Sequence, residues 1–331
     1  MSNVVVGAGA MGAALAVVHA RAGLQTTLLG TAFDDKAIEA CAAGDPHPAL
    51  GVALDRSIDC RPHVDREAVL RGAERIVLAV SSEGLADVAA ETAASARGEA
   101  TWLVATKGWD SDTLRTPSEV LSDAGVRRVV ILAGPALAPE LVAGGPTAVV
   151  CAGGNADVTA RVAETLRAAG VFATITDDVV AVEIAAAYKN VTAIAVGICE
   201  GLSERLTESV YVHRFANARA AMFAQGLKDM TRLAAGKGGR TETILGLAGA
   251  GDLYVTCLGG RNGNFGRLLG GGQTPEEAQR TIGSTVEGVP NTHAALRLAE
   301  RDAVDLRAAP AVAAVLSGEA SADEAVAVAL S

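Results

Sequence analysis

The fold of this chain is decided by the stretch Val4-Val5-Val6-Gly7-Ala8-Gly9-Ala10-Met11-Gly12, which runs into the apolar sequence Ala13-Ala14-Leu15-Ala16-Val17-Val18. This order predicts a strand, a glycine turn and a helix. The glycines permit a tight reversal and the close approach of a pyrophosphate, and the helix N-terminus offers unpaired N–H groups to the anion. The alternative is a tight turn that binds no ligand. The position of the turn between strand and helix favours a dinucleotide site.

The residues that would recognise the ribose are missing from their usual place. The second predicted strand, Gln25–Leu29, ends in Gly30-Thr31-Ala32-Phe33, with no acid for a 2′-hydroxyl and no Arg for a 2′-phosphate. Asp34 and Asp35 follow late, and we expect them to cap the helix Asp35–Ala42. The choice between NAD and NADP therefore stays open.

The first half of the chain alternates strand-like and helical runs, which predicts an α/β fold with a doubly wound (Rossmann-type) parallel sheet. After Asp177-Asp178 the strand runs stop, and alanine-rich helical patterns follow, broken at Pro290 and Pro310. We expect a dinucleotide-binding domain over residues 1–178 and an all-α substrate and catalytic domain over residues 179–331. The predicted strands are Asn3–Val6, Gln25–Leu29, Arg75–Val80, Thr101–Ala105, Arg128–Leu132, Thr147–Cys151 and Phe172–Thr176.

A single lysine lies inside an almost unbroken apolar helical run, Glu183–Gly197. Burial of Lys189 would remove its hydration and lower its pKa toward the range useful for proton transfer. The alternative is a surface lysine whose stem lies on apolar neighbours while its amine stays in water. The predicted place of Lys189 at the start of the helical domain favours the functional interpretation.

A glycine-rich stretch, residues 249–262, contains Asp252, Thr256, Arg261 and Asn262. The planar fork of an arginine matches phosphate oxygens in pairs, and an amide adds directed hydrogen bonds. The stretch therefore predicts an anion site, and its alternative is a glycine-rich surface loop.

Together these stretches resemble the NAD(P)-dependent glycerol-3-phosphate dehydrogenase family over nearly the whole chain. Several independent motifs occur in the family's order, which makes the resemblance specific. The matching motifs are Gly7 to Gly12, Ala105-Thr106-Lys107-Gly108, Gly134-Pro135-Ala136-Leu137-Ala138-Pro139-Glu140, Lys189-Asn190, Gly251 to Cys257, Arg261-Asn262 and Glu287-Gly288.

The resemblance implies an enzyme that interconverts dihydroxyacetone phosphate and sn-glycerol 3-phosphate by hydride transfer with NAD or NADP. It implies that Lys189 is the general acid and base, with Asp252 holding it and Lys107 near substrate and nicotinamide, and these three are the implied catalytic residues. The implied substrate-binding residues are Lys107, Gly134, Lys189, Asp252, Thr256, Gly260, Arg261 and Asn262. The implied cofactor-binding residues are Gly7, Gly9, Ala10, Met11, Gly12, Lys107, Ala138, Arg261 and Glu287.

The chain departs from the family at several positions. Met11 stands where many relatives carry an aromatic residue, Ala136 lacks a common hydroxyl, and Ser81-Ser82 replaces a Pro-Ser pair. The segment 202–216, which contains His213, is longer than the expected link, and its role is open. A longer segment close to Lys189 could reshape the site for another polyol phosphate.

Charge and composition exclude some functions. A formal net charge of −10 argues against nucleic acid as a partner. The five cysteines have no paired spacing, so we expect reduced core thiols, and no cluster has metal-ligand spacing. His47, between two prolines, is expected in a loop.

The chain enters its first strand at once, and no apolar run looks long enough to span a membrane, so we expect no signal peptide, no integral membrane segment and a cytoplasmic protein. A homodimer is one open possibility. Two alternative functions remain: a related dehydrogenase for another polyol phosphate or a hydroxy acid, and a nucleotide sensor without catalysis. The sensor would have no reason to keep Lys107, Lys189 and Asp252.

Overall fold

A computed structural model describes residues 2–96, 98–205 and 215–331, and the chain forms two compact units. The first unit comprises Met1–Asp110 and Arg115–Val179, and the second comprises Ser111–Leu114 and Val180–Ser331. The short segment Ser111–Leu114 belongs with the second unit because Arg297 donates hydrogen bonds to the carbonyls of Ser111 (2.6 Å) and Asp112 (3.1 Å).

The first unit contains one eight-stranded sheet in the order β3-β2-β1-β4-β5-β6-β7-β8. Neighbouring strands from β3 to β6 are parallel, as are β7 and β8, whereas β6 and β7 are antiparallel. Its elements are β1 (Ser2–Val6), α1 (Ala10–Arg21), β2 (Gln25–Leu29), α2 (Asp35–Ala43), β3 (Asp59–Arg61), η1 (His63–Asp65), α3 (Arg66–Leu70), β4 (Arg75–Leu78), α4 (Leu85–Ser95), β5 (Thr101–Val104), α5 (Pro117–Asp123), β6 (Val129–Ala133), α6 (Ala138–Ala143), β7 (Ala148–Ala152), α7 (Ala156–Ala168) and β8 (Phe172–Thr176).

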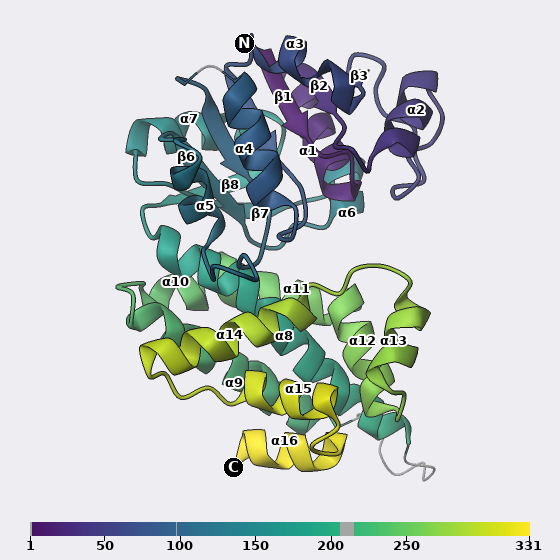
Figure 1. Cartoon of the computed structure of the whole chain (residues 1–331), viewed down its shortest axis with the longest axis vertical. Coiled ribbons are helices and arrows are strands. Elements are labelled where there is room, and N and C mark those ends of the chain that lie inside the picture. Colours follow the sequence, from purple (N-terminus) through teal and green to yellow (C-terminus); the bar gives the residue numbers. More distant parts are fainter. Residues whose placement is uncertain (1, 97, 206–214) are drawn as a thin grey trace. The chain divides into compact units, whose positions relative to one another are not determined.

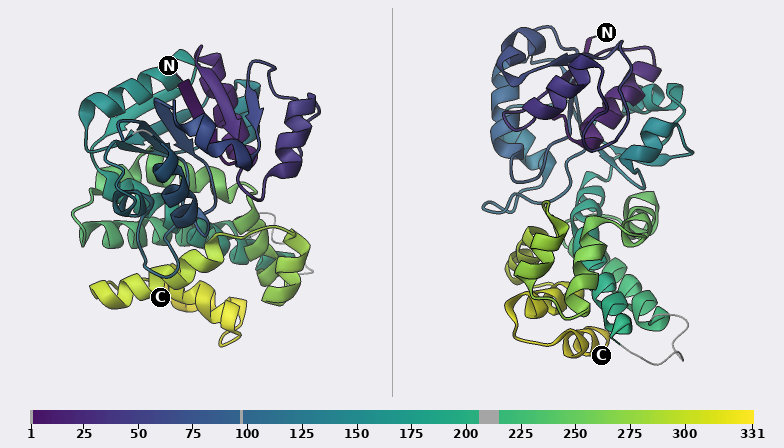
Figure 2. Two further views of the ribbon diagram at one scale, coloured as in Figure 1. Left: turned by 45° about the horizontal axis from the view of Figure 1, so that its top comes forward. Right: turned by 90° about the vertical axis from the view of Figure 1, so that its right-hand side faces the viewer.

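Helices cover both faces of this sheet. Helix α1 packs on α6 and α7, while α3, α4 and α5 form the other layer, as Figure 1 shows. Figure 2 shows the same two layers from another side. Buried Val, Leu and Ala side chains from β1, β4, β5 and β6 fill the space between sheet and helices. The prediction of a doubly wound α/β sheet is confirmed.

The sheet differs from the prediction in two details: it contains one strand, β3, that was not predicted, and it is not parallel throughout. Strand β3 has only three residues, Asp-Cys-Arg, none of them buried, so it offers no apolar pattern to read. The sheet is also not wholly parallel, because β7 runs against β6. An apolar run predicts that a strand exists but carries no information about its direction.

The second unit is helical, in agreement with the prediction. Both prolines that were expected to break helices instead lie in first turns, Pro290 in α14 and Pro310 in α15, where the missing N–H has no intrahelical partner. The elements are α8 (Val179–Glu204), α9 (Ala216–Ala235), α10 (Thr241–Leu245), the π-helical turn η2 (Leu247–Gly251), α11 (Asp252–Cys257), α12 (Arg261–Gly270), α13 (Pro275–Ile282), α14 (Gly288–Asp302), α15 (Ala308–Ser317) and α16 (Ala322–Leu330).

Helix α8 extends beyond the predicted apolar run Glu183–Gly197 at both ends. Among the described residues it is the single helix whose length and composition would suffice to cross a membrane, and α10 to α12 would pass the same test only as one span bent by 54°. Of the apolar window of α8, 89% is buried inside the protein. Such burial is the property of a core helix. Within the expected extra segment 202–216, residues 206–214, His213 among them, lie outside the described residues.

Candidate active site

The glycines of the turn after β1 serve different purposes. A Cβ on Gly7, whose φ is 101°, would lie 2.7 Å from the carbonyl oxygen of Ala79, and a Cβ on Gly12 would lie 1.9 Å from that of Gly7. A Cβ on Gly9 would meet no atom within 4 Å. The first and last glycines are thus required by the chain itself, whereas Gly9 faces open space at the N-terminus of α1. Backbone N–H groups beside open space fit the pyrophosphate of a dinucleotide.

Ala8, which lies between Gly7 and Gly9, is held by two side chains, one at its N–H and one at its carbonyl. The N–H of Ala8 donates to Asp34 Oδ2 at 3.0 Å, and His47 Nε2 lies 2.9 Å from the Ala8 carbonyl oxygen. Because His47 Nδ1 accepts from the N–H of Ala49 at 3.2 Å, the ring proton is on Nε2, which donates to Ala8. His47 does lie in a loop, as expected, but its side chain is buried.

The sequence predicts that Asp34 caps α2, but its side chain does not do so. It occupies the residue before the helix, but its side chain makes no cap hydrogen bond. Its Oδ2 accepts instead from the N–H and the hydroxyl of Thr31, at 2.8 and 2.7 Å, and from Ala8. A carboxylate thus lies at the end of β2 after all.

Further predicted residues of the first unit follow the carboxyl ends of parallel strands, where open α/β sheets bind their ligands. Lys107 is half-buried after β5, and the Thr106 hydroxyl donates to the carbonyl of Val80 at 2.8 Å, tying that loop to the one after β4. Gly134 follows β6 with φ 106°, and a Cβ there would lie 3.2 Å from Val149 Cα. Ala138 is the first residue of α6. Ala10 and Met11 open α1.

In the second unit, Lys189 forms a buried ion pair. Its Nζ donates to Asp252 Oδ1 at 2.5 Å and to Thr256 Oγ1 at 3.0 Å. The side chains of Lys189 and Asp252 are 8% and 2% exposed, which rules out the surface-lysine alternative. The Thr256 hydroxyl donates to the carbonyl of Asp252 at 2.6 Å, so its oxygen lone pairs face the ammonium.

The backbone before Asp252 is irregular. Residues Leu247–Gly251 form one π-helical turn, and Asp252 starts α11 directly after it. A Cβ on Gly249 would lie 2.0 Å from the carbonyl oxygen of Ile244, so the turn requires glycine there. Such turns often mark functional sites, because the wider coil changes the direction of the next side chains. Here it aims a carboxylate at α8.

The amides of Asn190 and Asn262 join α8 to α12 and α14. Asn262 Nδ2 donates to Asn190 Oδ1 at 2.9 Å, and Asn262 Oδ1 accepts from the N–H of Gly288 at 2.9 Å. Asn190 Nδ2 lies 3.5 Å from Glu287 Oε2. The amide oxygen of Asn262 and one of its N–H groups are therefore engaged within the protein. This side chain therefore connects α12 to α8 and α14.

Arg261 has a different environment. It is exposed at the first residue of α12, after the N-cap Gly260. The first N–H groups of this ten-residue helix have no intrahelical acceptor. A guanidinium beside a helix N-terminus is suited to bind an anion.

Glycines allow α8 and α12 to pack backbone against backbone. A Cβ on Gly197 or Gly201 of α8 would lie 2.1 or 2.0 Å from the carbonyl oxygen of Gly263 or Arg267. A Cβ on Gly266 of α12 would lie 2.1 Å from that of Ile194. This close contact fixes Lys189 relative to the N-terminus of α12, and nothing in the sequence pattern pairs these glycines.

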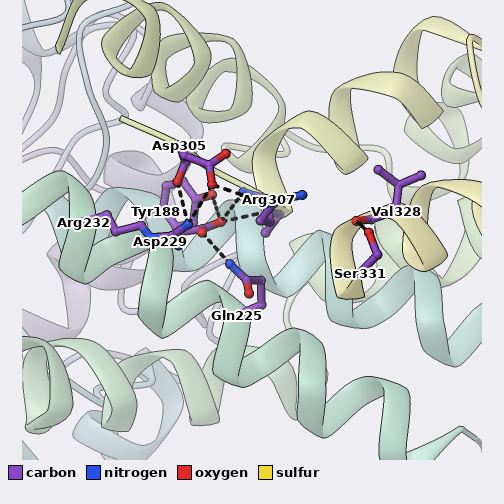
Figure 3. Close-up of polar contacts among 9 residues, drawn as sticks. Tyr188, Gln225, Asp229, Arg232, Asp305, Arg307, Val328 and Ser331 are labelled. Carbon is purple, nitrogen blue, oxygen red and sulfur yellow. Dashed lines mark hydrogen bonds and ion pairs between the residues drawn. The ribbon is translucent and has the colours of Figure 1, made fainter. Parts of the chain in front are cut away.

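The residue before the lysine anchors the other side of α8 (Figure 3). Tyr188 Oη donates to Asp229 Oδ2 at 2.7 Å, and that oxygen also accepts from the N–H groups of Arg307 (3.0 Å) and Ala308 (2.8 Å). Gln225 Nε2 donates to Asp229 Oδ1 at 2.8 Å. Burial, and then the Asp229 charge, raise the pKa of Tyr188 well above its usual value, which keeps the hydroxyl as a donor. Sequence reasoning missed this network because its members are scattered along the chain.

Other chemistry-bearing groups lie outside these sites. All five cysteines are free, and burial raises the pKa of Cys257 to about 12, so it stays a protonated thiol.

In the described part of the chain, no three His, Cys, Asp or Glu residues could hold a metal ion. A cavity of about 650 Å³ lies at the amino ends of β4 and β5, lined partly by Arg75, Arg128 and Arg161, and it includes none of the predicted site residues.

Comparison with known proteins identifies the family. The NAD-dependent glycerol-3-phosphate dehydrogenase N-terminal domain matches residues 3–159, and the corresponding C-terminal domain matches residues 178–327. The chain belongs to the NAD-dependent glycerol-3-phosphate dehydrogenase family. It is 35% identical over 326 residues to a glycerol-3-phosphate dehydrogenase [NAD(P)+] of Stenotrophomonas maltophilia strain K279a, covering 97% of this chain and 92% of that protein.

Solved structures agree with this assignment. A glycerol-3-phosphate dehydrogenase from Coxiella burnetii superposes with a TM-score of 0.87 and 31% identity, over 98% of this chain and 97% of that one. A ketopantoate reductase of Ralstonia eutropha, with a TM-score of 0.62 and 15% identity over 98% of this chain and 99% of that one, shares the fold alone. The family resemblance read from the sequence is confirmed, and the alternatives, another dehydrogenase or a sensor, are not favoured.

Proposed function

We propose that this chain interconverts dihydroxyacetone phosphate and sn-glycerol 3-phosphate with NAD(P)H, and that Lys189 moves the proton. Membership of a family of NAD(P)-dependent dehydrogenases, in both halves of the chain, supports the reaction. The buried ion pair of Lys189 and Asp252 is the observation that carries the residue assignment.

The nicotinamide, when bound, supplies or accepts the hydride at the central carbon of the substrate. The chain must handle the proton. In reduction, Lys189 Nζ donates a proton to the oxygen that develops on the central carbon, and in oxidation it removes the proton of the alcohol. Asp252 and Thr256 hold the ammonium in place at 2.5 and 3.0 Å, and the positive charge stabilises the developing oxyanion.

We assign the substrate phosphate to Arg261 and the N–H groups that follow Gly260, where a charged fork and a helix N-terminus offer donors together. Asn262 supports this site through Asn190 and Gly288. The other roles rest on the family resemblance: Lys107 and Gly134 toward the substrate, and Gly7, Gly9, Ala10, Met11, Gly12, Lys107, Ala138, Arg261 and Glu287 toward the cofactor.

Rates of NADH and NADPH oxidation with dihydroxyacetone phosphate test the proposal. Unphosphorylated dihydroxyacetone is the matched control substrate, because it has the same carbonyl without the anion. We expect turnover with the phosphorylated ketone and far lower kcat/KM without the phosphate. Equal kcat/KM on both ketones would overturn the phosphate assignment, and no turnover on either would overturn the reaction.

The proposal includes a cytoplasmic enzyme, which fits a soluble phosphorylated substrate, and a homodimer as the form to test. Cell fractionation and light scattering on the purified protein check these two points.

A further inference from the structure

The carboxylate at the end of β2 bears on a choice that the sequence left open. In dinucleotide-binding sheets, an acid about 20 residues after the glycine turn accepts the ribose 2′-hydroxyl of NAD, and a basic residue accommodates the 2′-phosphate of NADP. Asp34 follows Gly12 by about that distance. It comes five residues after β2 ends, which is why the sequence pattern missed it.

The backbone folds Asp34 back to the strand end. β1 and β2 run parallel with Val6 beside Leu29, and the N–H of Gly7 donates to the carbonyl of Leu29 at 2.9 Å. The two loops therefore leave the same edge of the sheet. The bond from Ala8 N to Asp34 Oδ2, 3.0 Å long, places the carboxylate directly beside the glycine turn.

One oxygen of Asp34 remains for a ligand. Oδ2 already accepts from Ala8 and twice from Thr31, and the hydrogen bonds of Asp34 within the described residues all go to this oxygen. The side chain is half-buried rather than enclosed. Oδ1 thus keeps its lone pairs for a hydroxyl donor at the strand end.

Among the described residues, the two basic side chains that follow β2 or end β3 make no hydrogen bond or ion pair with the glycine turn. Arg61 ends the neighbouring strand β3, but its guanidinium pairs with Asp59 at 2.9 Å and with Asp65 at 3.8 Å. Lys36 is exposed in the first turn of α2, next to Asp35. The charge that lies against the turn itself is negative.

We propose that Asp34 makes this enzyme select NAD(H) over NADP(H), because its carboxylate accepts the ribose 2′-hydroxyl and repels a 2′-phosphate. The inference rests on the proposed function only in requiring that a dinucleotide binds at the glycine turn. It narrows the cofactor from NAD or NADP to NAD.

Direct titration of the full-length protein with NADH and NADPH, by calorimetry at fixed ionic strength, tests this inference without any turnover. We expect NADH to bind at least about tenfold more tightly, since placing like charges together is costly. Asp34→Asn removes the charge while its amide oxygen can still accept from Ala8. That variant should lower the ratio of the two dissociation constants by about tenfold, mainly through tighter NADPH binding.

Asp35→Asn is the matched control, since it makes the same charge change one residue away and should leave the ratio unaltered. Asp34→Ser is a second uncharged variant, to be read in the same way should Asp34→Asn not fold. Equal affinities in the unmodified protein, or an equal shift of both affinities in the Asp34 variants, would show that Asp34 only ties the loop. Binding of neither nucleotide to folded protein would instead overturn the proposed function.

Discussion

The glycine turn of the first unit and the Lys189 site of the second differ in how their parts are spaced along the chain. The turn offers backbone N–H groups from one short run, Gly7 to Gly12, and open space at Gly9. The lysine site joins two side chains 63 positions apart in a buried ion pair. The turn depends on the space left by the missing side chain of Gly9, and the lysine site depends on a buried ion pair. They should therefore be sensitive to opposite changes.

Added volume should disable the turn completely. Gly9→Val should leave the first unit folded, because a Cβ at Gly9 meets no protein atom, yet it should abolish dinucleotide binding by filling the space beside the N–H groups. Calorimetric titration measures the loss. Gly154→Val is the control, since that glycine is also open and is exposed. Unchanged affinity in folded Gly9→Val would place the nucleotide elsewhere.

Lost charge should disable the second region. Lys189→Ala should lower kcat by at least ~10²-fold, the usual cost of losing a general acid or base, while the dissociation constant for the cofactor changes little. Steady-state kinetics and a titration measure the two quantities. Lys228→Ala removes an exposed lysine of the same unit and should change neither. Near-full turnover of Lys189→Ala, with its fold checked by circular dichroism, would remove the lysine from the mechanism.

A change of shape at constant charge separates phosphate binding from proton transfer. Arg261→Lys keeps the charge but loses the planar fork, so KM for dihydroxyacetone phosphate should rise by roughly one to two orders of magnitude, the scale of a charge-assisted hydrogen bond worth ~1.5–3 kcal/mol. The cofactor KM should change less. Arg280→Lys, on exposed α13, serves as the control. An unaltered substrate KM would contradict the phosphate assignment.

The smallest expected effect concerns stability rather than activity. His19 of α1 is fully buried, its Nδ1 donates to the Leu15 carbonyl at 2.7 Å, and burial lowers its pKa to about 4. Unfolded chain, with an ordinary histidine pKa near 6.5, binds more protons between these values, so the stability of the first unit should fall as pH falls. The loss should reach about 2 kcal/mol by pH 5.

Denaturant unfolding at pH 7 and pH 5 measures this loss, followed by the fluorescence of Trp102 and Trp109, which both lie in the first unit. His19→Gln, which cannot take up a proton, should show a shallower dependence on pH. An equal dependence in both proteins would assign the loss to other groups.

Features built from neighbouring residues can be predicted from the sequence, whereas contacts between distant residues cannot. The glycine turn can be predicted because its residues are neighbours in the chain, and the burial of Lys189 can be predicted because a single charge interrupts an apolar run. The sequence predicts Asp34 as a helix cap, because a short polar side chain before a helix usually is one, but the structure shows no such hydrogen bond. The Tyr188–Asp229 network and the glycine contacts of α8 with α12 left no pattern, because each residue type is ordinary in its own helix.

The sequence by itself determined the two kinds of structure, the dinucleotide turn, the family and the residue expected to move the proton. These follow from short-range periodicity and from motifs whose residues are neighbours in the chain. Only the tertiary structure decided the direction of β7, the pairing of Lys189 with Asp252 and Thr256, the engagement of Asn262 within the protein, and the return of Asp34 to the end of β2. The physical reason is that these contacts join distant residues, and their partners are chosen by how buried elements pack rather than by any local preference of the backbone.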